Sequence, residues 1–183
     1  MSYSTESKTR KNRMRYPSFE EIRDGVVMAL RRFYLNDLYL LQEGVHERSM
    51  TFRLGMYLQQ IFSGWYVDCE YNRNTSEPNH IKSIPWQNVY PDVIIHRRGT
   101  NNNLLAIEAK PPHASGDDIK EAKDKIVEYV GYKPLRYRFG LFIEFKDNFE
   151  CTCTDLRWYR RGKDKKLYWH DNAGVMIPTH RIG

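Results

Sequence analysis

The fold of this chain follows from residues 89–110, which read VYPDVIIHRRGTNNNLLAIEAK. Residues 89–97 have a β-branched, apolar centre and residues 104–110 are mostly apolar, so each run predicts a strand. The segment RGTNN at 98–102 predicts a short turn, which makes the two strands antiparallel neighbours. The second strand is expected to end at Pro111, because proline cannot donate to the ladder of a sheet.

Charged residues stand at the ends of these strands that lie away from the turn. Asp92 precedes the apolar run of the first strand, and Glu108 and Lys110 close the second. Side chains alternate between the two faces of a strand, so Glu108 and Lys110 point the same way. Antiparallel pairing sets the start of the first strand beside the end of the second, which predicts that Asp92 lies close to both.

This group of side chains suits a divalent cation. Two neighbouring carboxylates repel each other unless positive charge lies between them, and magnesium favours one or two carboxylates together with water and substrate phosphate. The ion would neutralise charge on a scissile phosphate and acidify a water. Lys110 would hold or help to deprotonate that water and stabilise the developing charge. In the alternative interpretation, Asp92 is a turn residue, and Glu108 and Lys110 form a salt bridge on an edge strand.

A further acid is expected from a helix over about residues 46–62. Glu47 falls in register with the buried stripe of this helix, so its carboxylate is expected to point at the sheet and to bind a second metal or orient a water. Alternatively, Glu47 is simply the acidic residue that the helix dipole favours at an N-terminus. The stripe itself consists of Met50, Leu54, Leu58 and Ile61.

The rest of the chain predicts helices flanking a mixed sheet, which is an α/β fold. A capping box at Ser18 and Glu21 starts a helix that ends near residue 35, where Asn36 and Asp37 break it. The other expected elements are a short extended or buried segment at 38–41, strands at 65–71 and 139–145, a loop at 72–88, a helix at 117–130 capped by Ser115, and a C-terminal hairpin of 156–160 with 166–169.

Length and charge bound the class of protein. The 183 residues predict a single domain over 17–183, preceded by a flexible basic tail at 1–16. Apolar runs are too short for a bilayer, and the N-terminus lacks the apolar stretch of a signal peptide, so we expect a cytoplasmic protein that does not bind membranes. The net charge of +6 favours polyanions such as nucleic acid.

The residues Pro91-Asp92, fifteen intervening residues and Glu108-Ala109-Lys110 together resemble the motif of the PD-(D/E)xK nuclease superfamily, the restriction endonuclease-like proteins. The order of elements over about residues 44–146 is also similar, with an extra N-terminal helix and the C-terminal hairpin outside it. The resemblance implies metal-dependent hydrolysis of DNA. It implies Asp92, Glu108 and the Ala109 carbonyl as ligands of Mg²⁺, with Mn²⁺ able to replace it, Lys110 as the catalytic lysine and Glu47 as the helix acid.

Other residues are weaker candidates for the same function. Phosphate contacts are expected from five basic residues, which are Arg48, Arg53, Arg97, Arg98 and Lys125. Asp68 and Glu70 share one face of a strand and are best explained by exposure, and His96 is expected to be non-catalytic. A homodimer is plausible because cutting both strands of a duplex takes two sites. The alternatives are an RNA-directed nuclease and an inactive module that binds nucleic acid or a partner protein.

Overall fold

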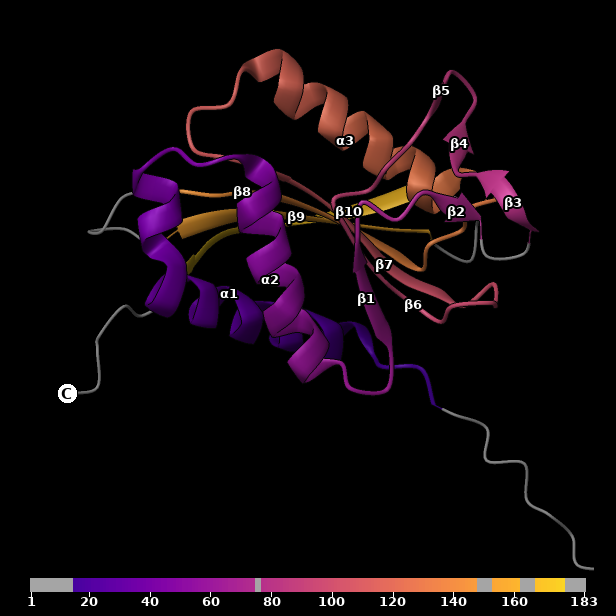
Figure 1. Cartoon of the computed structure of the whole chain (residues 1–183), viewed down its shortest axis with the longest axis horizontal. Helices are drawn as coiled ribbons and strands as arrows, with labels where there is room; N and C mark the ends of the chain where they lie inside the picture. The colour runs from indigo at the N-terminus through magenta and orange to yellow at the C-terminus, as the bar shows by residue number, and fades with distance from the viewer. Residues whose placement is uncertain (1–14, 75–76, 148–152, 162–166, 177–183) are drawn as a thin grey trace, which may run out of the picture.

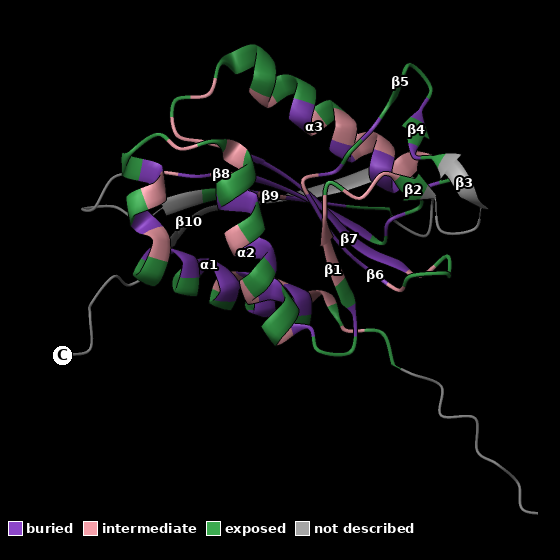
Figure 2. Cartoon of the chain, viewed as in Figure 1, coloured by how far each residue is buried: buried purple, intermediate pink, exposed green. Residues whose placement is uncertain are grey.

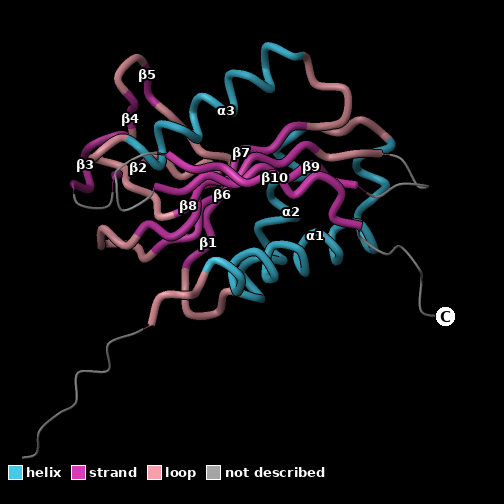
Figure 3. Tube along the Cα trace, turned by 180° about the vertical axis from the view of Figure 1, so that it is seen from behind, coloured by secondary structure: helices cyan, strands magenta, loops and turns pink. Residues whose placement is uncertain are grey.

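The computed structural model describes residues 15–74, 77–147, 153–161 and 167–176. Within these residues, α1 (Phe19–Gln42) and α2 (Glu47–Ile61) cover one face of a six-stranded sheet, and α3 (Gly116–Gly131) covers the other (Figure 1; seen from behind in Figure 3). The strands, in spatial order, are β1 (Tyr66–Cys69), β6 (Val93–His96), β7 (Asn103–Lys110), β8 (Phe139–Glu144), β9 (Cys153–Arg161) and β10 (Leu167–Met176). The expected α/β fold with a central sheet and flanking helices is confirmed.

The sheet is mixed because one of its pairs is parallel. β7 and β8 run parallel, joined by the crossover through α3, while the other four pairs are antiparallel. The β6–β7 hairpin has the expected form, with Val93 opposite Ile107 and the turn at its far end. This topology brings the last residues of β7 and β8 to the same end of the sheet as the first residues of β6.

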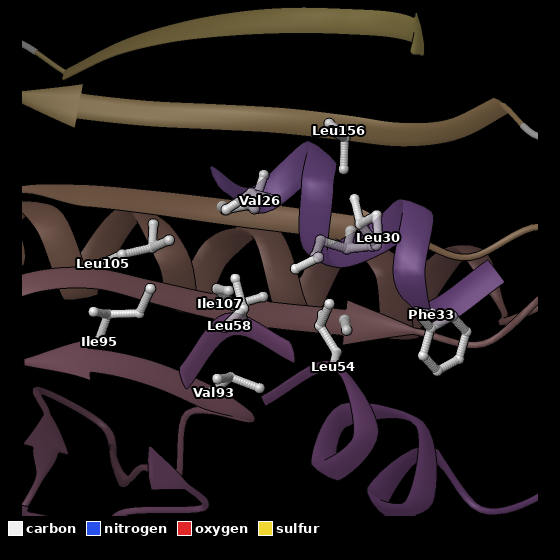
Figure 4. Packing of buried hydrophobic residues seen from close by; sticks show 14 of the residues in the cluster. Val26, Leu30, Phe33, Leu54, Leu58, Val93, Ile95, Leu105, Ile107 and Leu156 are labelled. Atoms are coloured by element: carbon white, nitrogen blue, oxygen red, sulfur yellow. The ribbon is translucent and has the colours of Figure 1, made fainter. Parts of the chain in front are cut away.

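Apolar side chains fill both faces of the sheet. On the first face, Leu30 of α1 and Leu54 of α2 belong to the same buried cluster as Leu105 and Ile107 of β7 (Figure 4). Against the second face, α3 sets Ile126 so close to β8 that a Cβ at Gly140 would lie 2.5 Å from the Cγ2 of Ile126. The middle strands are therefore buried on both sides, as the purple ribbon of Figure 2 shows.

The first helix is longer than the sequence predicted. The sequence predicted a helix break at Asn36 and Asp37 and a short extended or buried segment at 38–41. Instead, these residues are helical and α1 continues to Gln42. Leu38 and Leu41 are buried and prolong the apolar stripe of the helix, and the amide of Asn36 donates to the carbonyl of Arg32 within the same helix. Burial of this extra turn outweighs the weak helix propensity of asparagine and aspartate.

The prediction of a plain loop over 72–88 is also wrong. The backbone forms two small sheets there, β2 (Arg73–Asn74) with β3 (Glu77–Ile81) and β4 (Ser83–Ile84) with β5 (Gln87–Asn88). Runs this short carry too few side chains for an alternating pattern, so their pairing depends on main-chain hydrogen bonds that the composition does not reveal.

The remaining predicted elements are confirmed, although β10 runs to Met176 and is much longer than the strand predicted at 166–169. Helices α2 and α3, strand β8 and the hairpin of β9 with β10 all form, and the Ser115 hydroxyl caps α3 by accepting from the N–H of Asp118. Residues 1–14 of the predicted tail and 162–163 of the predicted hairpin turn lie outside the described residues. None of the helices described is both long and apolar enough to cross a bilayer.

Candidate active site

The predicted acids and the lysine meet at one end of the β6–β7 hairpin. Asp92 immediately precedes β6, and continuing the register of the hairpin by one residue places it opposite Glu108. The side chains of Glu108 and Lys110 point to the same face of the sheet as Ala106, and that face is the one covered by α3. The sequence prediction that these three residues share one end and one face of the sheet agrees with this register.

Asp92 is held by main-chain hydrogen bonds on both sides. The N–H of Ala109 donates to its Oδ2 at 2.7 Å, and the N–H of Glu70 donates to its carbonyl oxygen at 3.2 Å. Its Oδ1 accepts no hydrogen bond from the described part of the chain. The carboxylate is thus fixed in orientation and keeps one oxygen available to a ligand.

Glu108 is a buried acid with a single hydrogen-bond donor among the described residues. Its exposed fraction is 3%, and the phenol of Tyr129 on α3 donates to its Oε1 at 2.8 Å. Burial, and after it the negative charge of Asp92, raise the pKa of Glu108 well above its ordinary value. A carboxyl group in this position holds its proton strongly unless a cation comes near it.

The pKa of Asp92 is displaced in the same direction. Its pKa is raised to about 7: burial and then the charge of Glu47 raise it, while the hydrogen bond from Ala109 and the charge of Lys110 lower it. The two facing acids therefore titrate as a pair rather than separately. In the metal-free protein near neutral pH, this pair carries less negative charge than two ordinary carboxylates.

Lys110 and Glu47 form an ion pair that joins β7 to α2. The Nζ of Lys110 donates to both carboxylate oxygens of Glu47, at 2.9 and 3.1 Å. Burial lowers the pKa of Lys110, but the hydrogen bond with Glu47 and the charge of Asp92 raise it more, so the net shift is upward. Lys110 is therefore an ammonium at neutral pH, which fits a role in holding a water and stabilising negative charge better than a role as a base.

α3 adds two side chains to this end of the sheet. Lys125 lies close enough for its charge to lower the pKa of Asp92 and Glu108, and it also pairs with Glu121 at 2.8 Å. Tyr129, one helical turn further on, reaches Glu108. Sequence analysis placed Tyr129 within the helix expected at 117–130 and did not predict its hydrogen bond. The available signal was the phenol itself, because a buried tyrosine hydroxyl usually has a partner.

The arginines predicted to contact phosphate are divided among three places. Arg48 follows Glu47 and pairs with Glu70 at 2.5 Å, beside the candidate site. Arg53 binds Asp37 of α1 at 2.8 Å and so fastens α2 to α1. Arg97 and Arg98 lie at the turn of the hairpin, at the opposite end of the strands from Asp92. Of the four, Arg48 is thus placed beside the candidate site.

His96 and Asp68 form a separate pair within the sheet. The Nε2 of His96 lies 2.7 Å from the Oδ2 of Asp68, which also accepts a hydrogen bond from Arg98 at 2.9 Å. These bonds, with burial opposing them, lower the pKa of Asp68 below its usual range. His96 sits at the far end of β6 from Asp92, outside the candidate site.

The donor set at the candidate site fits a cation held by few protein ligands. The described residues contain no group of three or more histidine, cysteine or acidic side chains spaced to hold a metal ion. Asp92 and Glu108 nevertheless face each other with raised pKa values, and each keeps a carboxylate oxygen that accepts no hydrogen bond from a described residue. Magnesium suits such a site because it retains several waters and needs one or two carboxylates.

The sequence matches no protein-family model, and no curated protein matches it.

Proposed function

We propose that this chain is a magnesium-dependent endonuclease that hydrolyses phosphodiester bonds in DNA, with a PD-(D/E)xK site on a restriction endonuclease-like fold. The observation that carries the proposal is the position of Asp92 opposite Glu108, with Lys110 on the same strand face. Buried carboxyls that face each other cost stability in the metal-free protein, and strongly raised carboxyl pKa values are concentrated at functional sites.

Each residue of the site would have a different role in hydrolysis. Asp92, Glu108 and the carbonyl of Ala109 would hold Mg²⁺, or Mn²⁺ in its place. When bound, the ion supplies charge neutralisation at the scissile phosphate and acidifies an attacking water. Lys110, as an ammonium, donates to that water and to the developing negative charge, and Glu47 positions Lys110 through their ion pair.

Cleavage of DNA with and without metal tests this function. Purified protein is incubated with plasmid and linear duplex DNA in Mg²⁺, in Mn²⁺ and in EDTA. We expect cleavage in both metals and none in EDTA, and we expect Asp92→Ala and Lys110→Ala to abolish it while circular dichroism shows the fold retained. Failure to cut either DNA or RNA in either metal, together with unchanged nucleic-acid binding by Asp92→Ala, would contradict the proposal.

A second candidate is a module that binds nucleic acid or a protein partner without cleaving. The observation in its favour is that Lys110 is already paired with Glu47, so the ammonium is partly neutralised. Calorimetric titration separates the two candidates. Magnesium binding that disappears in Asp92→Asn supports the nuclease, whereas no magnesium binding supports the inactive module.

The choice of substrate and the assembly state belong to the same proposal. A panel of duplex DNA, single-stranded DNA and RNA, cut under identical conditions, distinguishes a DNA nuclease from an RNA-directed one. Because a double-strand break takes two sites, we propose a homodimer on duplex DNA. Size-exclusion chromatography with light scattering, in the presence of a non-cleaved duplex, tests this.

A further inference from the structure

A basic cavity lies at the opposite end of the sheet from the candidate active site. It has a volume of about 640 Å³ and is lined by the last turn of α3, the loop leading to β8 and the end of β9. The N–H of Arg138, which precedes β8, donates to the carbonyl of Asn103 at the first residue of β7. Glu108 and Lys110 stand at the other end of that strand. The cavity is therefore separate from the acid pair.

The lining of this cavity is strongly cationic. Four of its residues are basic and, among the described residues that line it, none is acidic; the four are Lys133, Arg136, Arg138 and Arg161. Tyr137 also belongs to the lining, with its hydroxyl accepting a hydrogen bond from the buried Lys82 at 2.8 Å. A volume of this size lies in the range of small-ligand pockets, roughly 300–1,000 Å³. The charge selects an anion, and the volume admits one as large as a nucleotide.

The end of a helix does not by itself account for this charge. Basic side chains are favoured near a helix C-terminus, and the Nη1 of Arg161 does donate to the carbonyl of Gly131 at 3.0 Å. Arg138 instead lies over the ring of Tyr16, at 5.1 Å from its centroid. Lys133 and Arg136 have neither a helix carbonyl nor a carboxylate as partner in the described part of the chain. Among the described residues, Lys133, Arg136 and Arg138 thus have no carboxylate partner around this hollow.

The backbone at Arg136 supports a functional origin for this arrangement. Arg136 has φ of +41°, in the left-handed region that disfavours a side chain. Its neighbours Leu135 and Tyr137 are buried, and the amide of Asn103 donates to the carbonyl of Leu135 at 2.7 Å, so the surrounding loop imposes this conformation. Glycine would satisfy this conformation at lower cost, yet an arginine occupies the position and presents its guanidinium at the cavity.

We propose that this cavity binds the phosphate group of a nucleotide, either free or within a nucleic-acid strand. Guanidinium groups match phosphate geometry with paired hydrogen bonds, and two or three of them around one hollow give both affinity and orientation. The site goes beyond the proposed nuclease function, because it requires no metal and none of the acid pair. Binding of a nucleic-acid strand in this cavity rests on the proposed nuclease function, whereas binding of a free nucleotide does not.

Calorimetric titration of the full chain in EDTA tests the phosphate requirement. The probes are inorganic phosphate, adenosine monophosphate and adenosine, with EDTA present to keep metal from the acid pair. We expect adenosine monophosphate and phosphate to bind and adenosine not to bind. Absence of binding by both phosphate compounds at millimolar concentration, or equal binding of adenosine and its monophosphate, would overturn the proposal.

The variant Arg136→Gly tests the location. Glycine suits the positive φ, so the fold is expected to be kept or stabilised, and a thermal melt checks this. We expect affinity for adenosine monophosphate to fall about tenfold or more, since charge-assisted hydrogen bonds are lost. Arg31→Gln, an equal charge loss at an exposed position on α1, should leave the affinity unchanged. Equal affinities in wild type and Arg136→Gly would refute the location.

Two further arms distinguish the source of the phosphate and separate this proposal from the nuclease. A single-stranded oligonucleotide that displaces adenosine monophosphate in competition indicates a strand as the ligand, and failure to displace it indicates a free nucleotide. Asp92→Asn should keep the binding of adenosine monophosphate unchanged, because Asp92 lies at the other end of the sheet. Loss of cleavage with intact nucleotide binding, or the reverse, therefore shows which of the two proposals has failed.

Discussion

The two ends of strand β7 carry opposite charge in different surroundings. At its C-terminal end Glu108 is buried and faces Asp92, and the pKa of both acids is raised. Beyond its N-terminal end lie Arg136 and Arg138, both exposed to solvent. Glu108 and the first residue of the strand are five residues apart, about 17 Å at the rise of an extended chain. The comparison teaches that the protein bears a cost in stability at the acidic end, whereas water screens the charges at the basic end.

The largest expected effect is on catalysis at the acidic end. Under the proposed function, Lys110→Met removes the ammonium that would stabilise developing charge, and we expect the single-turnover rate of DNA cleavage to fall by about 10²–10³-fold or more. Glu47→Gln keeps the lysine but loosens its position, so its rate should fall less. Arg31→Gln serves as the matched control for the lost positive charge. A wild-type rate in Lys110→Met would show that the acidic end is not a cleavage site.

The next effect concerns metal affinity. Tyr129→Phe removes the hydroxyl that donates to Glu108 at 2.8 Å and leaves the ring in place. Groups that orient a metal ligand typically change affinity by about 10–100-fold, so we expect magnesium binding, measured by calorimetry, to weaken about tenfold. Tyr132→Phe, three residues along the chain, provides the control, because among the described residues it is the Tyr129 hydroxyl that donates to Glu108. Equal affinities in the two variants would remove Tyr129 from the site.

A smaller effect is expected on the pH dependence of stability. Because the pKa of Asp92 is raised to about 7, the folded protein binds this proton more tightly than the unfolded chain. Stability of the metal-free protein should therefore fall as pH rises from about 4 to about 7, and the penalty is complete above that range. Glu108 adds to the loss with the same sign.

Asp92→Asn removes this penalty and reports on it directly. In EDTA at pH 8 the variant should melt about 2–4 °C higher than wild type, which corresponds to about 1 kcal/mol for a chain of this size. At pH 4 the two melting temperatures should coincide. A lower melting temperature of the variant at pH 8 would mean that the ionised carboxylate of Asp92 does not destabilise the folded protein.

The smallest effect is expected towards the basic end. Arg98 is about half exposed and shares Asp68 with His96, which keeps its own contact with Asp68 at 2.7 Å when the arginine is lost. Exposed ion pairs contribute about 0.2–1 kcal/mol, so Arg98→Gln should lower the free energy of unfolding by less than about 1 kcal/mol. Urea unfolding measures it. A loss above that range would show that charged groups at the two ends of β7 affect the free energy of unfolding to a similar extent.

The acid pair was predictable because it depends on local pattern. Strand alternation and a short turn are enough to place Asp92 opposite Glu108 and to set Lys110 on the same face. The ends of the elements were less predictable. The last turns of α1 form because Leu38 and Leu41 find a buried surface, and this is a tertiary effect that overrides the local signal of Asn36.

The basic cavity could not be predicted for a related reason. Arg136 and Arg161 are separated by more than twenty residues, and β9 brings them together through its pairing with β8. The hydrogen bond between Tyr129 and Glu108 likewise depends on how closely α3 approaches the sheet at Gly140. Charge content indicated an affinity for polyanions, but the position of the charges depends on topology.

The β6–β7 hairpin also bears on how the chain reaches its native state. Its two strands are joined by a turn of a few residues, so this pairing is among the most local in the central sheet and is expected to form early. Its closure sets Asp92 against Glu108 before α3 can supply the Tyr129 hydroxyl. Repulsion between the two carboxylates therefore raises the free energy of the folding transition state. Refolding in EDTA, measured by stopped flow, is expected to be faster at pH 5 than at pH 8. The Asp92→Asn variant should abolish this difference.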